Sequence, residues 1–572
     1  MSDIKEYERR YIAKDLKVKT WEDLAPYAED LRTRAWADEA AYRRWLEDWD
    51  EFGVVSAEES CWRYIRISVD TENEADKNAY NDWVNKVQTQ LGVLENDLSK
   101  RMIASPFNDS VKEQGFSLLL KRSKAGIALF REANVPLLAK EQELGAQYGE
   151  IAGAQTVEID GKTMTIAQAG TRMEWPDRAK REEAWQLLNA RRYQDKGKFD
   201  ALYDEMVALR HQIALNADEK NYRDYKFKDY QRFDYTAQDC FDFHEAIEKA
   251  VVPIVAEMAR KRKQDMGLDT LRPWDLKCDV KNRPAIIAFK DSKELIDKTI
   301  QMLDATAPFS ADTLRRMREK NLLDLDSRKG KAPGGYNSGL PETRSSFMFT
   351  NQAQTVRDME TVVHEAGHAT HDRLSSVQSL NAYQLYPMEL AEVASMSLEL
   401  LTHDQWHVFF PDEETLNRAK YNHLKSIIEF FPNMARIDAF QHAVYENPAL
   451  TVEQRHDVWE KLQHRFGSNT VDWTGLNDDY LRTSWQGILH IFEVPFYYVE
   501  YGIAQLGALQ IWRNYKQDKK QAIEQYREAL SLGYTKSIPE TYKTAGISFD
   551  FSVKMLTELM DFVRTEMEKV AS

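Results

Sequence analysis

Two histidines and the glutamate between them are the residues of this chain whose types and spacing best suit chemistry. His364 and His368 stand four residues apart in the segment TVVHEAGHATHDRL, and Glu365 follows the first of them. On an α-helix, positions i and i+4 share a face, so the two imidazoles can each direct a ring nitrogen at one ion about 2.0–2.1 Å away. Glu365, turned by about 100° around the helix, can reach a water molecule on that ion. A chain with only twelve histidines rarely contains this pattern by chance, so it predicts a zinc site with Glu365 as the base.

The helix expected to carry these residues has its own start signal and its own buried face. Thr355 followed by Asp358 is a typical arrangement for a helix N-terminus. One stripe at helical spacing is apolar and consists of Val356, Met359, Val362, Val363, Ala366 and Gly367. The neighbouring stripe is polar and consists of Glu360, His364, His368 and His371. Four polar residues beside a core-facing stripe indicate a buried polar site rather than a solvated face.

A catalytic zinc ion needs a third protein ligand and an open position for water. A histidine ten residues after the first would define one class of zinc peptidase, but that position is Leu374. His371 lies one turn further along the helix, and we interpret it as a structural or outer-sphere group rather than a ligand. A carboxylate from a following helix is the better candidate.

The segment PMELAEVASMSLELL is expected to form that following helix, because Pro387 suits a first helical turn. It offers three carboxylates, those of Glu389, Glu392 and Glu399. Its small residues, Ala391, Ala394 and Ser395, would let it approach the histidine helix closely. Periodicity alone does not choose among the three glutamates.

Composition sets the background for these motifs. The 572 residues are 43% apolar and 30% charged, with few glycines and prolines, as in globular proteins. The formal charge of −16 opposes binding to nucleic acid or to anionic lipid. The start MSDIKEYERR lacks the apolar core of a secretory signal, no run of about 18 apolar residues occurs, and the three widely spaced cysteines form no disulfide framework or Cys-based zinc knuckle. We therefore expect a cytoplasmic protein without nucleic-acid or membrane partners.

Helical periodicity covers most of the chain, as in residues 82–102, 181–214 and 240–264. The segment QTVEIDGKTMTI is an exception, because two alternating runs flank Asp160-Gly161, a common hairpin turn. Residues 324–351 collect turn formers and then alternate, so they are expected to form a loop followed by a short strand. We place a soft boundary near residue 195, between a helical first part and a second part that holds the chemistry.

Three blocks, in order along roughly 170 residues, carry a family resemblance. They are GKAPGGYNSGLPETRSSFMFTN, DMETVVHEAGHATH joined to ELAEVASMSLELL, and HIFEVPFYYVEYG. With these blocks the chain resembles the thimet oligopeptidase and oligoendopeptidase F family of zinc metallopeptidases, more closely the oligoendopeptidase F branch. The resemblance implies that His364, His368 and Glu392 bind zinc and that Glu365 activates the zinc-bound water. It also implies that Glu399 and Glu360 orient the ligands.

The third block implies electrophilic help from His490, Tyr498 and Tyr501, whose hydrogen-bond donors would stabilise the oxyanion. The interval from His490 to the tyrosines differs by one residue from that of the thimet branch, so Tyr497 is an alternative to Tyr498. By the same likeness, the glycine-rich loop and the strand SSFMF would line the substrate cleft. An extended peptide would pair its backbone with a strand edge, and Gly334, Gly335 and Tyr336 would close over it.

Together these inferences predict a mostly α protein, with two helical lobes around a deep substrate cleft and a small β element near the histidine helix. Residues 1–195 would form an N-terminal helical region and residues 196–572 the catalytic region of one packed body. The expected activity is that of an endopeptidase with one zinc ion per chain, which hydrolyses internal bonds of short peptides. A zinc carboxypeptidase of similar build is the main alternative, and a non-catalytic peptide-binding protein is another. The sequence leaves the oligomeric state open.

Overall fold

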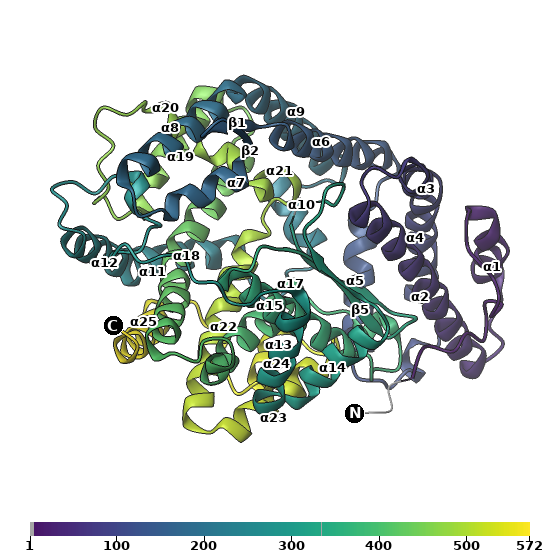
Figure 1. The fold of residues 1–572 in the computed structure, drawn as a ribbon. Coiled ribbons are helices and arrows are strands. Elements are labelled where there is room, and N and C mark those ends of the chain that lie inside the picture. Colours follow the sequence, from purple (N-terminus) through teal and green to yellow (C-terminus); the bar gives the residue numbers. More distant parts are fainter. Residues whose placement is uncertain (1–4, 333, 572) are drawn as a thin grey trace.

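The computed structural model describes residues 5–332 and 334–571, and most of them are helical (Figure 1). The first part of the chain contains α1 (Trp21–Thr33), α2 (Glu39–Val69), α3 (Glu74–Asp82), α4 (Thr89–Ile103), α5 (Phe116–Leu129), α6 (Val135–Gly153), α7 (Ile166–Gly170), α8 (Arg178–Gln194) and α9 (Lys196–Asn216). The middle contains α10 (Tyr222–Asp229), α11 (Ala237–Ala250), α12 (Val252–Asp265), α13 (Ser292–Thr306), α14 (Pro308–Glu319), α15 (Val356–Ser375), α16 (Asn381–Gln384) and α17 (Met388–Leu401). The last part contains α18 (Glu413–Glu446), α19 (Val452–Phe466), α20 (Asp479–Arg482), α21 (Leu489–Glu493), α22 (Tyr498–Gln517), α23 (Lys519–Leu530), α24 (Ile538–Thr544) and α25 (Val553–Lys569). The prediction of a mostly helical fold is confirmed.

Short helical turns connect several of these elements. A π-helical turn, η1 (Trp83–Gln88), joins α3 to α4. The 3₁₀ turns are η2 (Asn108–Ser110), η3 (Glu132–Asn134), η4 (Thr171–Glu174), η5 (Pro273–Asp275), η6 (Thr402–Val408) and η7 (Ser484–Gly487).

The predicted hairpin forms a two-stranded sheet. Strands β1 (Thr156–Ile159) and β2 (Lys162–Thr165) pair antiparallel. Asp160 and Gly161 between them have φ values of 54° and 70°, in the left-handed region that a two-residue hairpin turn requires. This local prediction is confirmed because the turn chemistry and the alternation agree.

The second sheet differs from its prediction. Residues 324–351 were expected to form a loop and one short strand, whereas the structure has three strands, β3 (Leu323–Asp326), β4 (Tyr336–Leu340) and β5 (Ser345–Gln352). Their order is β3-β5-β4, with β3 parallel and β4 antiparallel to β5. The sequence of β4, YNSGL, has weak strand propensity, and its pairing with the buried strand β5 holds it extended. The strand SSFMF is therefore the central strand, and β4 is an edge strand of this sheet.

The helix that carries the two histidines, α15, begins at the predicted cap. The Thr355 side chain accepts a hydrogen bond from the Asp358 backbone N–H, and the Asp358 side chain accepts one from the Thr355 backbone N–H. The helix packs against β5 on one side and against α17 on another. At the second contact, a Cβ atom added to Gly367 would lie only 2.5 Å from Cα of Ser395. The predicted close approach of the two helices is therefore confirmed.

The largest apolar cluster includes residues of α15, α17 and α22. Val362 of α15, Ala394 of α17 and Ala508 of α22 are all fully buried in it. Because α17 is buried along nearly its whole length, its three glutamates are placed by a rigid core rather than by a surface helix. This packing fixes the positions from which the polar side chains reach one another.

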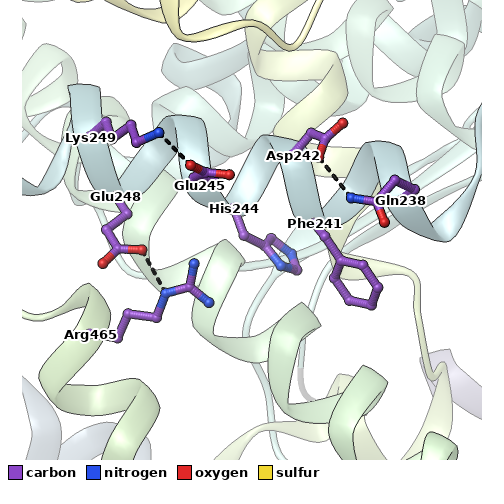
Figure 2. A pocket seen from close by; sticks show the side chains of 8 residues that line it. All are labelled: Gln238, Phe241, Asp242, His244, Glu245, Glu248, Lys249 and Arg465. Carbon is purple, nitrogen blue, oxygen red and sulfur yellow. Dashed lines mark hydrogen bonds and ion pairs between the residues drawn. The ribbon is translucent and has the colours of Figure 1, made fainter.

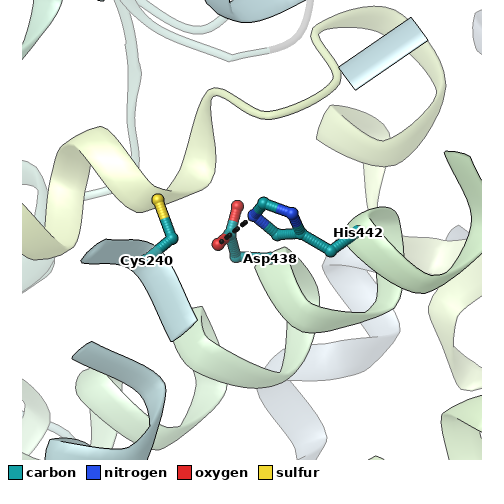
Figure 3. A group of neighbouring side chains, drawn as sticks. All are labelled: Cys240, Asp438 and His442. Atoms are coloured by element: carbon teal, nitrogen blue, oxygen red, sulfur yellow. Dashed lines mark ion pairs between the residues drawn. The ribbon is translucent and has the colours of Figure 1, made fainter. Parts of the chain in front are cut away.

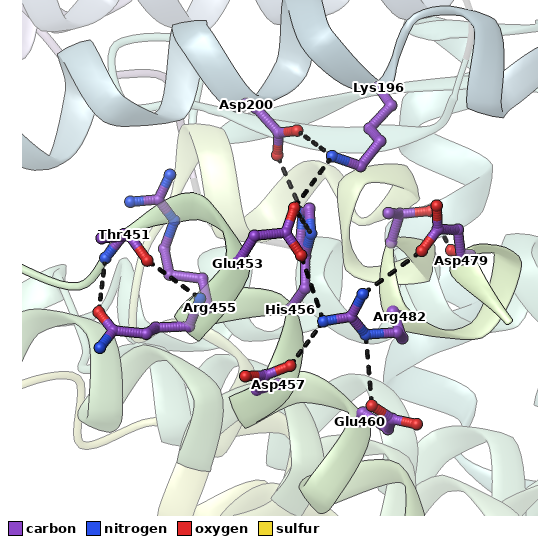
Figure 4. A network of polar contacts seen from close by, with 12 residues as sticks. Lys196, Asp200, Thr451, Glu453, Arg455, His456, Asp457, Glu460, Asp479 and Arg482 are labelled. Carbon is purple, nitrogen blue, oxygen red and sulfur yellow. Dashed lines mark hydrogen bonds and ion pairs between the residues drawn. The ribbon is translucent and has the colours of Figure 1, made fainter.

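Polar contacts hold α9, which begins just after residue 195, against α19 (Figure 4). On α9, the Asp200 carboxylate accepts from Lys196 Nζ at 2.9 Å and lies 3.1 Å from Nε2 of the buried His456 of α19. Arg482, at the end of α20, reaches Asp457 and Glu453 of α19. The contact of Asp200 with His456 is buried, so it holds α9 against α19 more firmly than the exposed ion pairs do. The division at residue 195 stays a prediction.

Among the described residues, no helix combines the length and the apolar character that crossing a membrane would require.

Candidate active site

Three polar side chains converge where α15 crosses α17. Nε2 of His364 lies 3.2 Å from Nε2 of His368 and 3.3 Å from Oε2 of Glu392, and Nε2 of His368 lies 3.7 Å from the same oxygen. Ligands about 2.1 Å from one tetrahedral ion are about 3.4 Å apart, so these atoms have the spacing of ligands to a single metal ion. Two imidazoles and one carboxylate are also a donor set of catalytic zinc sites. The residues present therefore fit a zinc ion.

The structure separates the three glutamates that spacing could not distinguish. Glu392 Oε2 is the carboxylate oxygen that faces the two histidines. Glu389 lies elsewhere in the core and accepts a hydrogen bond from the Tyr235 hydroxyl at 2.6 Å. Glu399, two turns after Glu392, reaches the other ring nitrogen of His364. Each glutamate thus has a different partner, although all three belong to one helix.

A chain of polar contacts continues behind His364. Its Nδ1 lies 2.6 Å from Oε1 of Glu399, and Oε2 of Glu399 lies 3.0 Å from Nε2 of His423 on α18. Nδ1 of His423 in turn lies 2.7 Å from Nε2 of His403 in η6. Burial favours the neutral form of Glu399, but its hydrogen bonds with His364 and His423 hold its pKa well below the usual range. A carboxylate in this position fixes the ring of a metal-binding histidine and keeps Nε2 free for the metal.

The Glu365 carboxylate has the environment expected of a general base that acts on a water molecule. Its side chain is 7% exposed, and Oε2 has no hydrogen-bond partner among the described residues. Burial raises its pKa, and the histidines on either side of it in the motif oppose that rise. A buried carboxylate oxygen without a partner beside a metal-ligand set is unusual in a purely structural site. The geometry therefore leaves one carboxylate oxygen of Glu365 free to accept a proton.

The third sequence block approaches the same group through Tyr497. Its hydroxyl donates a hydrogen bond to Oε1 of Glu392 at 2.9 Å. Burial favours the neutral form of Glu392, but the nearby His368, the contact with His364 and the bond from Tyr497 lower its pKa to about 2. The backbone places Tyr497 there, because Phe496 adopts a positive φ of 66° just before α22 begins.

The other residues of this block surround Tyr497. The ring of Tyr501 lies 5.0 Å from that of Tyr497 and 6.0 Å from that of His490, which stands on the short helix α21. Tyr498 lies 4.8 Å from the His490 ring and 6.1 Å from that of Phe430. Burial lowers the pKa of His490 and raises that of Tyr501. The structure thus brings all four predicted aromatic residues together, with Tyr497 in contact with the ligand set.

The two remaining polar residues of α15 take different positions. Glu360 is buried, with its carboxylate 3.4 Å from a guanidinium nitrogen of Arg357, and burial raises its pKa. His371 stacks on Tyr386 with ring centroids 3.5 Å apart. Burial lowers the pKa of His371 well below its usual value, and the ring does not belong to the ligand set.

Sequence reasoning missed His423 and His403. His423 follows Glu399 by 24 residues and lies on another helix, and neither histidine belongs to a motif with a fixed spacing. Contacts that only the folded chain supplies, of Glu399 with His423 and of His423 with His403, bring them behind His364. The one available signal was composition. The chain has few histidines, and a histidine that is buried needs a polar partner.

Comparison with known families decides the relationship of this chain. Residues 171–561 match the model of peptidase family M3, and residues 15–130 match the peptidase M3 N-terminal domain. The chain belongs to peptidase family M3. All the residues of the candidate site lie inside the first match, and the resemblance read from the sequence is confirmed.

Relatives within the M3 family are distant in sequence. A 300-residue match is 23% identical to an oligoendopeptidase F homolog of Borreliella burgdorferi and covers 52% of this chain and 50% of the relative. A 400-residue match is 22% identical to the group B oligopeptidase PepB of Streptococcus agalactiae and covers 64% of this chain and 63% of the relative. The chain therefore spans about half the length of the first relative and less than two thirds of the second.

The fold is shared across the whole chain. This M3 chain superposes on PZ peptidase A, solved with inhibitor 2, with a TM-score of 0.90 and 25% sequence identity, over 98% of this chain and 99% of the other. The likeness includes the helices before residue 195 as well as those that carry the site. M3 peptidases are metallopeptidases, which agrees with the donor set at the crossing of α15 and α17.

Proposed function

We propose that this chain is a zinc-dependent endopeptidase that hydrolyses internal bonds of short peptides. The observation that carries the proposal is the convergence of His364, His368 and Glu392 beside the unpaired, buried carboxylate oxygen of Glu365. Membership of the M3 family supports it, as do relatives named as oligopeptidases. The three converging residues would hold one zinc ion.

When bound there, zinc would supply a Lewis acid that acidifies water and polarises a peptide carbonyl. Glu365 would take a proton from the attacking water and pass it to the leaving amine. Glu399 would keep the His364 ring in the orientation that the site needs, because it holds the ring by Nδ1. Tyr497 would do the same for the Glu392 carboxylate.

Tyr501 and His490 would donate hydrogen bonds to the oxygen on which negative charge develops. Their rings lie 6.0 Å apart, and the Tyr501 ring is 5.0 Å from that of Tyr497, which contacts Glu392. A phenol donates without carrying a charge of its own, so it favours the transition state over the neutral carbonyl. Tyr498 would act as a second donor from beside His490, or Tyr497 would replace it.

An extended peptide would lie along β4. This strand is at the edge of the three-stranded sheet whose central strand packs on α15, so its outer backbone groups are the ones available for pairing. A deep cleft between two helical lobes would admit a flexible chain and exclude a folded surface. A folded protein would need to offer about six to eight extended residues, spanning roughly 20–28 Å, to reach the metal.

The decisive experiment uses a peptide of about ten residues that is blocked at both ends. We expect mass spectrometry of the digest to show internal cleavage by the zinc-loaded enzyme. A carboxypeptidase would leave this peptide intact and shorten its unblocked form stepwise from the carboxyl end, which would overturn the proposal. A stable folded protein is the second substrate, and rapid internal cleavage of it would contradict the enclosed cleft.

Glu365→Gln is the matched control for the chemistry, because it removes the base and leaves all three ligands in place. We expect this variant to bind as much zinc as the wild type. Its kcat should be below a few per cent of the wild-type value. Zinc binding without turnover in the wild type as well would favour a non-catalytic peptide-binding protein.

A further inference from the structure

A second group of metal-ligand types lies in the core, away from the candidate active site. Cys240 of α11, with Asp438 and His442 of α18, places one sulfur, one carboxylate oxygen and one ring nitrogen within 4.8 Å of one another (Figure 3). Nε2 of His442 lies 3.3 Å from Oδ2 of Asp438, the same separation as between His364 and Glu392. All three side chains are at most 2% exposed.

The two helices contribute these residues in matching pairs. Asp438 and His442 are four residues apart on α18, and on α11 Cys240 is four residues before His244. Residues at that spacing share a helix face, so two facing helices offer four donors of three kinds. Nε2 of His244 lies 2.8 Å from Oδ2 of Asp438, the same oxygen that faces His442, and so holds that carboxylate in place. Oδ1 of Asp438 is then the oxygen that has no partner among the described residues.

The polar atoms of this group lack the partners that a purely structural cluster would have. Oδ1 of Asp438 and Nδ1 of His442 have no hydrogen-bond partner among the described residues, and Nε2 of His442 has only its 3.3 Å contact with Asp438. The His442 ring lies between aromatic rings, with centroids 4.7 Å from that of Phe241 and 5.2 Å from that of Phe496. An unpaired ring nitrogen and an unpaired carboxylate oxygen in such surroundings cost free energy, and a cation bound between the two side chains would take one nitrogen and that oxygen as ligands.

A pocket lies beside the cluster. A pocket of about 570 Å³ is lined by residues of α11 together with Arg465 of α19, and His244 is one of them (Figure 2). Three carboxylates line the same pocket, and each has a partner there: Glu245 pairs with Lys249, Glu248 pairs with Arg465, and Asp242 accepts a hydrogen bond from Gln238. His244 also contacts Asp438, so this buried ring separates the pocket from the cluster.

We propose that Cys240, Asp438 and His442 form a second metal site, with His244 holding Asp438 in position. Zinc accepts sulfur, nitrogen and oxygen donors, and these three side chains offer one of each. The site is separate from the first, because Asp438 follows His423 by fifteen residues on α18, a rise of about 22 Å. The metal content expected of the chain therefore rises from one ion to two, one for each ligand group.

A metal ion here would fasten α11 to α18 below the turn that leads to the active-site tyrosines. Gln441, beside His442, accepts a hydrogen bond at Oε1 from the backbone N–H of Phe496 at 2.8 Å, and Phe496 precedes Tyr497. The site would then be structural, because it fixes the helix on which that turn rests.

Metal content and cobalt spectroscopy test the proposal. We expect zinc-loaded wild type to retain two ions per chain after gel filtration, and the double variant His364→Ala, His368→Ala to retain one. In that double variant, cobalt should produce a thiolate-to-cobalt absorption band in the near ultraviolet. This measurement leaves the second group unaltered, so it does not depend on whether a core cysteine variant folds.

Cys240→Ser should lose the band and one ion while it keeps the ion of the first site. Cys61→Ser and Cys278→Ser are the controls, because these cysteines lie outside the ligand group, and both should keep the band. If the wild type saturates at one ion and the histidine double variant binds none, the second site does not exist. A cobalt band that survives Cys240→Ser would equally overturn the assignment. Loss of metal from the first site alone would contradict the proposed active site and leave the second site standing.

Discussion

Glu399 holds His364 from behind, with its Oε1 2.6 Å from Nδ1 of the imidazole. The same carboxylate contacts His423 at 3.0 Å through its other oxygen, so it links the ligand helix α15 to the long helix α18. This hydrogen bond restricts the His364 side chain to one rotamer, in which Nε2 points toward His368 and Glu392. The order within the ligand set therefore depends on residues that do not bind the metal themselves.

Glu399→Ala should weaken zinc binding by about 10–100-fold, because it removes the partner that orients the His364 ring. Competition with a chelator of known affinity measures the change. Glu360→Ala is the matched control on α15, since the polar contact of that carboxylate is with Arg357. Equal losses in the two variants would show that neither carboxylate orients a ligand specifically.

Glu392→Ala should lose zinc far more readily than Glu389→Ala or His371→Ala. Only Glu392 faces both histidines, whereas Glu389 pairs with Tyr235 and His371 stacks on Tyr386. The measurement is zinc per folded chain after a fixed exposure to chelator. Similar zinc content in all three variants would place the third ligand elsewhere.

Tyr501→Phe should lower kcat by about 10²–10³ with little change in KM, since its hydroxyl is proposed to act on charge that develops in the transition state. Tyr497→Phe should instead weaken zinc binding, because its hydroxyl donates to Glu392. Tyr498→Phe should have a smaller effect than either, since its ring packs on Phe430. Steady-state kinetics and zinc titration on the three variants separate these roles. An effect of Tyr501→Phe confined to KM would make it a residue that binds the ground state.

Much of the site could be predicted because its signals are local. The spacing of His364 and His368, the cap at Thr355 and the hairpin at Asp160-Gly161 each depend on a few neighbouring residues, and the structure reproduces the cap and the hairpin. Helical periodicity likewise predicted the fold class, because apolar stripes are repeated along most of the chain.

The rest depended on contacts between distant segments. His423 on α18 reaches Glu399 on α17 only when the chain has folded, and β4 is extended because β5 pairs with it. Helix spacing could not distinguish Glu389, Glu392 and Glu399, since each faces a neighbour that folding supplies. The positive φ of Phe496, which turns Tyr497 toward Glu392, follows no glycine or asparagine signal in the sequence.

Gly367→Ala should destabilise the protein and loosen its ligand set. The added Cβ would lie 2.5 Å from Cα of Ser395 and 2.9 Å from the backbone oxygen of Ala394, so α15 and α17 would have to move apart. Overpacking of this kind costs about 1–3 kcal/mol, and it outweighs the gain in helix propensity of about 1 kcal/mol that alanine brings. His364 and His368 flank Gly367 on one helix and Glu392 stands on the other, so the separation should also weaken zinc binding.

Gly92→Ala is the control for that prediction. Gly92 also lies inside a helix, but nothing lies within 4 Å of the Cβ it would acquire, so the substitution should be neutral or stabilising. Urea unfolding of both variants, followed by circular dichroism, gives the two changes in the free energy of unfolding, and chelator competition gives zinc affinity. If Gly367→Ala matched Gly92→Ala in both measurements, α15 and α17 would accommodate the added methyl group without moving apart. The close contact of these helices would then not determine the distance between the histidines and Glu392.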